Sequence, residues 1–208
     1  DLTDIALNAV LECRNKIEPY IRYCPEFATS LVPVQTDIPA SRIIRDMLEA
    51  GRLADVGPMA SVAGAVAQFT GKALLKHSQE VIVENGGDVF IKTDSETIST
   101  IYADKSPLSM KFGIKFQKYD KAFGLCTSSG TIGHSRSFGK ADSATILSDS
   151  CTLADAVATQ VGNIVKTDKD IQTGLDFGKF IPGIRGIVII IGENIGLWGD
   201  MELVRLSD

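Results

Sequence analysis

The chain has 208 residues, of which 44% are hydrophobic, so it holds enough apolar side chains for a full core and we expect one domain over residues 1–208. Its formal net charge is −5 and its 21 basic residues are scattered, which argues against a nucleic-acid-binding protein because such a protein needs a basic face. The longest apolar run, Ile184 to Ile191, is broken by Arg185 and Gly186 and is too short to span a bilayer.

The cysteines and the first residue bear on metal binding, on the cellular compartment and on what precedes the sequence. No C-x-x-C pair occurs and the chain has only two histidines, so a zinc site is not expected. Free thiols are typical of a reducing compartment, and we therefore expect a cytoplasmic protein. Because the sequence begins at Asp1 rather than Met, it leaves open whether further residues or a targeting segment precede it. The four cysteines are Cys13, Cys24, Cys126 and Cys151.

The first third of the chain is predicted to be helical, because its apolar residues recur at the helical period. Pro25 should end the first helix, since a residue before proline disfavours the helical conformation. Pro39 and Gly51 are typical of the start and the C′ position of a second helix. The predicted helices cover residues 2–23, 40–50 and 61–76, with one further turn over residues 26–31.

The small residues of the helix over residues 61–76 have two interpretations. Alanines and glycines leave little side-chain bulk, so the helix can pack closely on a sheet or on another helix. Its N-terminus could equally hold a phosphate, because the N–H groups of a first helical turn have no partner within the helix.

The rest of the chain alternates between strands and helices. Alternating apolar and polar residues, with turn residues between the runs, indicate antiparallel strands in the middle of the chain. Helices before and after them indicate an α+β fold with an antiparallel sheet. Strands are predicted over residues 81–84, 89–92, 97–102, 110–117, 124–128, 142–148, 187–191 and 201–206, helices over 152–166 and 171–180, and turn-like residues at 192–194 and 196.

The turn Asn85-Gly86-Gly87-Asp88 also has two interpretations. A Gly-Gly pair between two strands is typical of a tight hairpin. Two residues without side chains would also let a ligand approach the backbone closely. On the turn alone we favour the hairpin.

Asp155 and Thr159 are four residues apart on a predicted helix, so their side chains share one face. A carboxylate and a hydroxyl on one face can bind a hard cation such as Mg²⁺, which prefers oxygen ligands and completes its shell with water and phosphate oxygens. Spacing alone favours the simpler alternative, in which Thr159 bonds back to the carbonyl of Asp155 and the carboxylate is solvated.

The stretch between residues 124 and 159 gathers more hydroxyls, glycines and carboxylates than any other part of the chain. The run Thr127-Ser128-Ser129-Gly130 suits a phosphate-binding turn and an ordinary turn equally well. His134 follows and could act as a base, bind phosphate or simply lie at the surface. A serine hydrolase is excluded because the G-x-S-x-G elbow and the order of its partners are missing. Cys126 fits a small core residue better than a nucleophile.

Four motifs in this order resemble those of the ApbE family, the Mg²⁺-dependent flavin transferases. The family's first motif, like V-D-L-G-G-I-A-K-G, resembles Asp55 to Gly64, and its N-x-G-G-D turn resembles Asn85 to Asp88. Its T-S-G segment with a following histidine resembles Thr127 to Gly130 with His134, and its A-D-A-x-A-T helix resembles Ala154 to Thr159. The segments G-P-M-A-S-V-A-G-A and E-N-G-G-D are similar to those of a shorter branch of ApbE-like proteins.

The resemblance implies a fold, cofactors and roles. It implies a T-fold-like α+β arrangement, Mg²⁺ held by Asp155, Thr159 and the backbone carbonyl of Ala60, and FAD as the donor from which FMN passes to an acceptor protein. His134 matches the family histidine that is needed for activity. By the same resemblance the ligand would be bound by Gly57, Met59, Asn85, Gly86, Gly87, Asp88, Thr127, Ser128, Ser129 and Gly130.

The chain departs from the family pattern at three points. Ser61 stands where the family has a lysine, the family's H-x-x-D-P-x-T-G sequence is missing after His134, and the chain is smaller than a typical transferase. We therefore expect either Mg²⁺-assisted cleavage or transfer at the pyrophosphate of FAD or a similar nucleotide, or a non-catalytic nucleotide- or metabolite-binding protein on the same scaffold. Neither an acceptor protein nor the oligomeric state follows from the sequence, and a homo-oligomer stays open.

Overall fold

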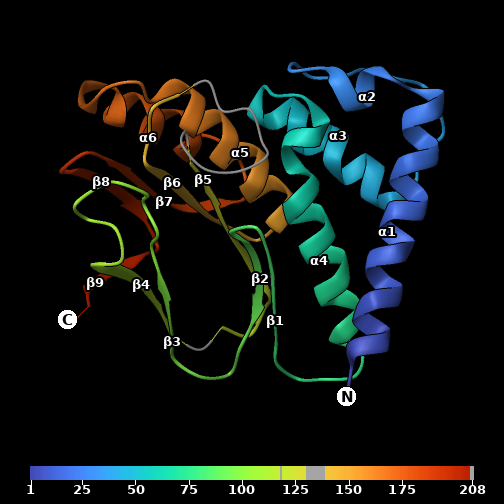
Figure 1. The fold of residues 1–208 in the computed structure, drawn as a ribbon, viewed down its shortest axis with the longest axis horizontal. Helices are drawn as coiled ribbons and strands as arrows, with labels where there is room; N and C mark the ends of the chain where they lie inside the picture. Colours follow the sequence, from blue (N-terminus) through green and yellow to red (C-terminus); the bar gives the residue numbers. More distant parts are fainter. Residues whose placement is uncertain (118, 130–138, 207–208) are drawn as a thin grey trace.

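The computed structural model describes residues 1–117, 119–129 and 139–206, and it combines helices with two antiparallel sheets (Figure 1). This arrangement confirms the predicted α+β class, whereas the T-fold-like relation stays a prediction. The helical elements are α1 (Thr3–Tyr23), α2 (Glu26–Thr29), α3 (Arg42–Ala54), η1 (Pro58–Ser61), α4 (Val62–Leu74), α5 (Cys151–Ile164), η2 (Asp168–Asp170) and α6 (Ile171–Lys179). The described helices include none with the length and apolar character that a membrane crossing requires.

Both sheets are antiparallel throughout. The larger has six strands in the order β1-β2-β5-β6-β7-β8, and the smaller has three in the order β3-β4-β9. The strands are β1 (Val81–Asn85), β2 (Asp88–Lys92), β3 (Thr97–Thr100), β4 (Phe112–Phe116), β5 (Phe123–Ser128), β6 (Ser143–Ser148), β7 (Ile184–Ile191), β8 (Asn194–Gly199) and β9 (Glu202–Arg205).

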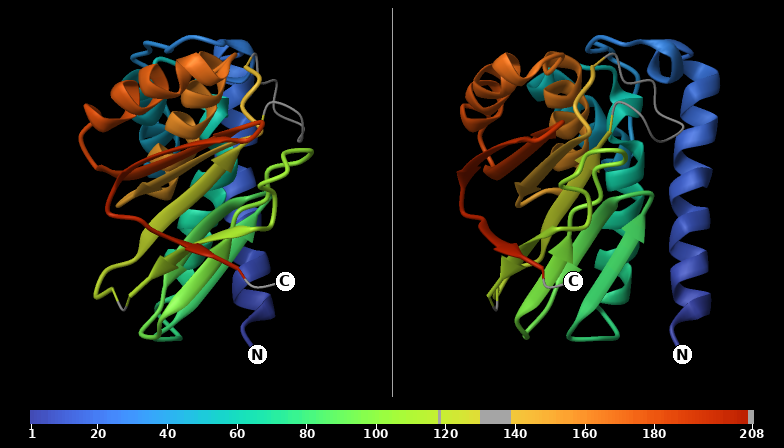
Figure 2. Two further views of the ribbon diagram at one scale, coloured as in Figure 1. Left: turned by 90° about the vertical axis from the view of Figure 1, so that its left-hand side faces the viewer. Right: turned by 60° about the vertical axis from the view of Figure 1, so that its left-hand side comes forward.

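The six-stranded sheet is covered on both faces. Helices α4, α5 and α6 pack on one face, and α1 and α3 pack on the outer side of that helical layer (Figures 1 and 2). The three-stranded sheet covers part of the other face, where its Ile114 and Phe116 form one cluster with Leu125 and Leu147 of the larger sheet. Because both faces are covered, the central strands are apolar on both sides and read as nearly continuous hydrophobic runs.

The second helix differs from its predicted end. Gly51, predicted at the C′ position, lies buried inside α3, and the left-handed residue that ends the helix is Asp55, with φ of 55°. A Cβ at Gly51 would lie 2.8 Å from the carbonyl oxygen of Val56, so glycine is required there by close packing rather than by a turn. The general preference for glycine after a helix was therefore misleading at this position.

The turn-like residues predicted at 192–194 and 196 are confirmed at 192 and 193 and wrong at 194 and 196. Residues 194–199 form the edge strand β8, which pairs with β7. Gly196 suits this strand because its Cα side faces α6, where a Cβ would lie 2.3 Å from a methyl carbon of Ile171. A glycine inside a strand can mark such a close approach as well as a turn.

Helix α5 lies in close contact with both its neighbours. Its N-cap is Ser150, whose side chain accepts a hydrogen bond from the backbone N–H of Leu153. A Cβ at Gly124 of β5 would lie 2.3 Å from Cα of Cys151, and a Cβ at Gly64 of α4 would lie 2.4 Å from the carbonyl oxygen of Cys151. The two glycines thus let the start of α5, at Cys151, approach both the sheet and α4.

We predict that Gly64→Ala destabilises the protein although alanine favours helices. The gain in helix propensity is about 1 kcal/mol, whereas overpacking against the fixed backbone of α5 costs about 1–3 kcal/mol or more. Denaturant unfolding should show a net loss of stability. An increase in stability would contradict the close approach of α4 and α5.

Candidate functional site

Asp155 connects two helices at the centre of the candidate site. Its side chain is only 8% exposed, and its Oδ2 accepts a hydrogen bond of 2.8 Å from the backbone N–H of Gly64, in the first turn of α4. First-turn N–H groups lack partners within their helix, so the carboxylate of Asp155 caps α4 from a neighbouring helix. The alternative of a solvated carboxylate is therefore wrong.

Thr159 lies one turn further along α5 and also faces the start of α4. Its Oγ1 donates a long hydrogen bond of 3.4 Å to the carbonyl oxygen of Ala60, rather than to the carbonyl of Asp155. Two of the three proposed metal ligands, Thr159 and Ala60, thus contact each other. The third, Asp155, binds the backbone four residues after Ala60.

These three residues offer the oxygen donors that a hard cation requires: a carboxylate, a hydroxyl and a backbone carbonyl. No group of three or more His, Cys, Asp or Glu side chains within the described ranges is arranged to hold a metal ion. A cation here would therefore need water or ligand oxygens to complete its shell, which is the usual state of Mg²⁺ in proteins. The donor set fits Mg²⁺ better than a metal that prefers nitrogen or sulfur.

The Gly-Gly turn forms the hairpin that we favoured, and the hairpin touches the start of α4. Gly86 and Gly87 join β1 to β2 with φ of 67° and 99°, and residues that carry a Cβ rarely adopt such positive values. The Asn85 side chain donates a 3.1 Å hydrogen bond to the carbonyl of Ala63, and the N–H of Thr127 donates to the carbonyl of Gly87 at 3.2 Å. The turn therefore lies between α4 and the end of β5.

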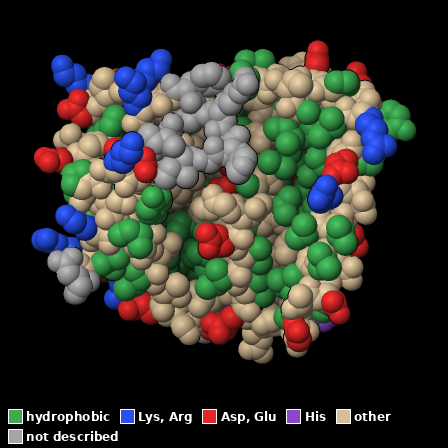
Figure 3. Space-filling model, in the orientation of Figure 1, with side chains coloured by type: hydrophobic (Ala, Val, Ile, Leu, Met, Phe, Trp, Pro, Cys, Tyr) green, Lys and Arg blue, Asp and Glu red, His purple; other side chains and the backbone are tan. Residues whose placement is uncertain are grey.

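A cleft of about 280 Å³ opens beside this turn, between the two sheets. Apolar side chains of Val89 and Leu125 lie in it with the half-exposed ring of Tyr102, so it combines an apolar surface with backbone and hydroxyl donors. In Figure 3, hydrophobic side chains gather in the lower centre of the same face, with acidic side chains around them. The cleft is lined by Glu84, Gly86, Gly87, Val89, Ser99, Thr100, Tyr102, Leu125, Thr127 and Ser129.

The sequence did not predict the residues that line the cleft from the second sheet. It also did not predict the hydroxyl group that lies next to Thr127. Tyr102 follows β3, and nothing in its local sequence indicates a ligand-facing position. Thr145 of β6 places its Oγ1 2.9 Å from Oγ1 of Thr127, a pairing that depends on strand register. Only the sheet order brings these residues to the turn.

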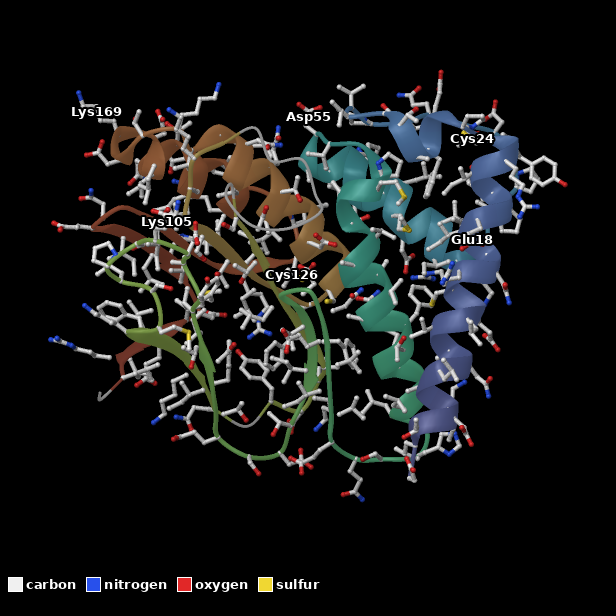
Figure 4. All side chains as sticks on the ribbon, in the orientation of Figure 1. Glu18, Cys24, Asp55, Lys105, Cys126 and Lys169 are labelled. Carbon is white, nitrogen blue, oxygen red and sulfur yellow. The ribbon has the colours of Figure 1, made fainter. Side chains whose placement is uncertain are left out.

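Asp88 and Cys126 lie together beneath the helices. Cys126, labelled in Figure 4, is fully buried, as expected for a core residue. Its Sγ lies 3.5 Å from Sγ of Cys151. Burial raises the pKa of the Asp88 carboxyl to about 7, although contact with the Cys126 side chain acts in the opposite direction. Burial raises the pKa of Asp155 well above its usual range, and the nearby charge of Asp88 raises it further.

The remaining residues that were predicted to bind the ligand lie in different parts of the fold. Gly57 packs on the loop after α2, where a Cβ would clash with the carbonyl of Ser30, and Met59 packs against the cluster of α1 and α3. Ser128 ends β5 and pairs with Ala144. Gly130 and His134 lie outside the residues that the structure describes.

Comparisons with known proteins agree with the motifs. A family model described as "AbpE bacteria" matches residues 1–195. A UPF0280 protein of Methanococcus aeolicus is 39% identical over 210 residues, covering 99% of this chain and 85% of the relative, and one of Methanosarcina acetivorans is 38% identical over 207 residues, covering 99% and 81%.

A solved ApbE protein of Thermotoga maritima is similar in fold. It is 18% identical, has a TM-score of 0.50, and the match covers 68% of this chain and 50% of that chain. The matched part of this chain thus spans half of that structure. At this identity the likeness concerns the fold alone.

The raised pKa of Asp88 predicts a pH dependence of stability in the metal-free protein. Between an unfolded pKa of about 3.9 and a folded pKa of about 7, the folded state binds more protons, so its stability falls as pH rises through this range. Asp88→Asn removes this loss, which amounts to up to about 4 kcal/mol.

Denaturant unfolding in EDTA at pH 4.5–8, about 3.5 pH units that begin above the unfolded pKa and extend past the folded one, tests this expectation. The stability of the wild type relative to Asp88→Asn should decline towards pH 7 and then level off. A constant difference across the range would show that the Asp88 carboxyl titrates as an ordinary surface group.

Proposed function

This chain belongs to the ApbE-like family, and on that premise we propose that it binds a divalent cation, Mg²⁺, together with a pyrophosphate-containing nucleotide such as FAD. The reaction that this site supports best is cleavage at the pyrophosphate. AMP would leave, and FMN would pass to the hydroxyl of an acceptor protein or to water. The observation that carries the proposal is the meeting of Asp155, Thr159 and Ala60 at the start of α4, next to the Gly-Gly turn.

The position of the proposed cation site supports a role in phosphate chemistry. A divalent cation supplies positive charge that stabilises the charge developing on phosphate oxygens. Asp155 would hold it with a carboxylate, while Thr159 and Ala60 would add neutral oxygens. The start of α4 would attract the same phosphate, because the partial positive charge of a helix lies at its N-terminus.

The cleft supports the rest of the proposed ligand. A Cβ added at Gly86 of its turn would meet no atom of the described residues within 4 Å, so a phosphate could approach this backbone without steric hindrance. Ser128 and Ser129 would add donors at the end of β5. Val89 and Tyr102 would contact a flat aromatic ring on the apolar side of the cleft.

Other parts of the proposal rest on the family resemblance. His134 would assist proton transfer to the leaving phosphate or from the acceptor hydroxyl. Gly130 would contribute a backbone donor, and Gly57 and Met59 would shape the approach to Ala60. A cytoplasmic location, a single domain over residues 1–208 and a homo-oligomer stay predictions.

One observation favours a non-catalytic binding protein as the second candidate. Ser61, which replaces the family's lysine, is fully buried, and its Oγ donates a 2.8 Å hydrogen bond to the carbonyl of Pro58. This position therefore stabilises η1 and offers no positive charge to a phosphate. A ligand could then bind without the charge stabilisation that cleavage requires.

We predict that Asp155→Asn abolishes the stabilisation by Mg²⁺. Asparagine keeps an oxygen that can accept the hydrogen bond from Gly64 but loses the charge that binds the cation. With Mg²⁺ at a hundredfold excess over its Kd, the wild type should gain about 2.7 kcal/mol in free energy of unfolding.

Asp149→Asn is the matched control, because Asp149 precedes the same helix but its side chain is 69% exposed and pairs with Arg185. This variant should retain the Mg²⁺ effect. An equal Mg²⁺ effect in wild type and Asp155→Asn would refute the assignment of the cation site.

Incubation with FAD and Mg²⁺, followed by chromatography, tests the reaction. Release of AMP and FMN, or AMP together with a flavin-labelled protein, is the expected result, and EDTA should suppress it. Saturable FAD binding without products would favour the non-catalytic candidate. Absence of both binding and products would contradict each flavin-based function.

A further inference from the structure

We propose that Asp88 contributes a second carboxylate to the divalent-cation site at the start of α4, beside Asp155. This inference rests on the proposed function, since it concerns the same cation. It changes the role of Asp88, which the sequence motif assigned to the ligand together with the rest of its turn. It also adds a negative charge to a donor set that otherwise contains a single carboxylate.

The position of Asp88 in its strand directs it to the helical face of the sheet. Asp88 is the first residue of β2, and side chains two residues apart in a strand share a face. Phe90, two residues later, meets α4, where its ring lies 2.1 Å from a Cβ built at Gly71. Asp88 therefore lies on the side of α4 and α5, whereas Val89 faces the cleft on the opposite side.

Contacts on each side of Asp88 place it near the first turn of α4. Its partner across the hairpin is Asn85, which binds the carbonyl of Ala63. Its partner in the other direction is Cys126, whose Sγ donates to the carbonyl of Cys151. The N–H that follows Ala63 belongs to Gly64 and binds Asp155. Asp88 and Asp155 thus face the same short segment of α4, and their charges influence each other.

The carboxylate of Asp88 contacts the Cys126 side chain, but one of its two oxygens is buried without a partner among the described residues. The side chain is 6% exposed, and its Oδ1 has no hydrogen-bond partner within the described ranges. No Lys or Arg of the described chain forms an ion pair with Asp88 or Asp155. Buried carboxylates are costly unless a positive charge or hydrogen bonds compensate them.

A purely structural role explains this arrangement poorly. The backbone of Asp88 already pairs in the sheet, and its neighbours Cys126 and Phe90 would accept an apolar residue. A neutral residue would avoid the repulsion from Asp155. A divalent cation would compensate both carboxylates, because Mg²⁺ and Mn²⁺ prefer oxygen ligands and gain affinity from each added carboxylate.

Binding of Mn²⁺ alone, followed by electron paramagnetic resonance of the free ion, tests the inference without requiring activity. Asp88→Asn should weaken Mn²⁺ binding by about tenfold or more, because even the mutation of a group that only orients a metal ligand typically costs that much affinity. Its thermal unfolding temperature in EDTA should equal or exceed that of the wild type. Asp149→Asn, which alters an exposed carboxylate, should bind Mn²⁺ like the wild type.

The outcomes separate this inference from the proposed function. If Asp155→Asn loses Mn²⁺ binding while Asp88→Asn keeps it, the cation site stands and the role of Asp88 is wrong. If the wild type binds no Mn²⁺, the proposed cation site itself fails. Should Asp88→Asn unfold at a lower temperature in EDTA, Asp88→Glu decides: stronger Mn²⁺ binding than Asp88→Asn supports the inference, and equally weak binding overturns it.

Discussion

The hydrogen bond between Asp155 and the N–H of Gly64 is the interaction on which the candidate site depends. It forms because glycine at position 64 lets α4 approach the backbone of α5, and because the first turn of α4 has N–H groups without helical partners. The same approach brings Thr159 to Ala60. A single helix-to-helix contact therefore positions all three proposed cation ligands.

The sheet adds the remaining parts from its two faces. On the helical face, the buried Asp88 and Cys126 lie under the same helix start. On the other face, the Gly-Gly turn and the end of β5 border a cleft whose far wall belongs to the second sheet. A ligand with phosphates and an aromatic ring would use both features, with its charged groups near α4 and its ring between the sheets.

Local patterns predicted most elements and the order of the motifs, because periodicity and capping depend on neighbouring residues. The hairpin at Gly86-Gly87 is confirmed. Gly51 was misread because the close packing that requires it involves residues beyond its helix. Spacing placed Asp155 and Thr159 on one face, but their partners at Gly64 and Ala60 depend on tertiary packing. The orphaned oxygen of Asp88 and the position of Tyr102 likewise depend on sheet order and could not be predicted from the sequence.

A crystal structure of the protein soaked with Mn²⁺ and FAD tests whether the cation binds at Asp155 and Thr159, since anomalous scattering locates the ion without reference to activity. We expect an anomalous peak at the start of α4, within ligand distance of Asp155 and Thr159, with the pyrophosphate of FAD beside it. A peak elsewhere, or FAD bound away from the Gly-Gly turn, would contradict this expectation.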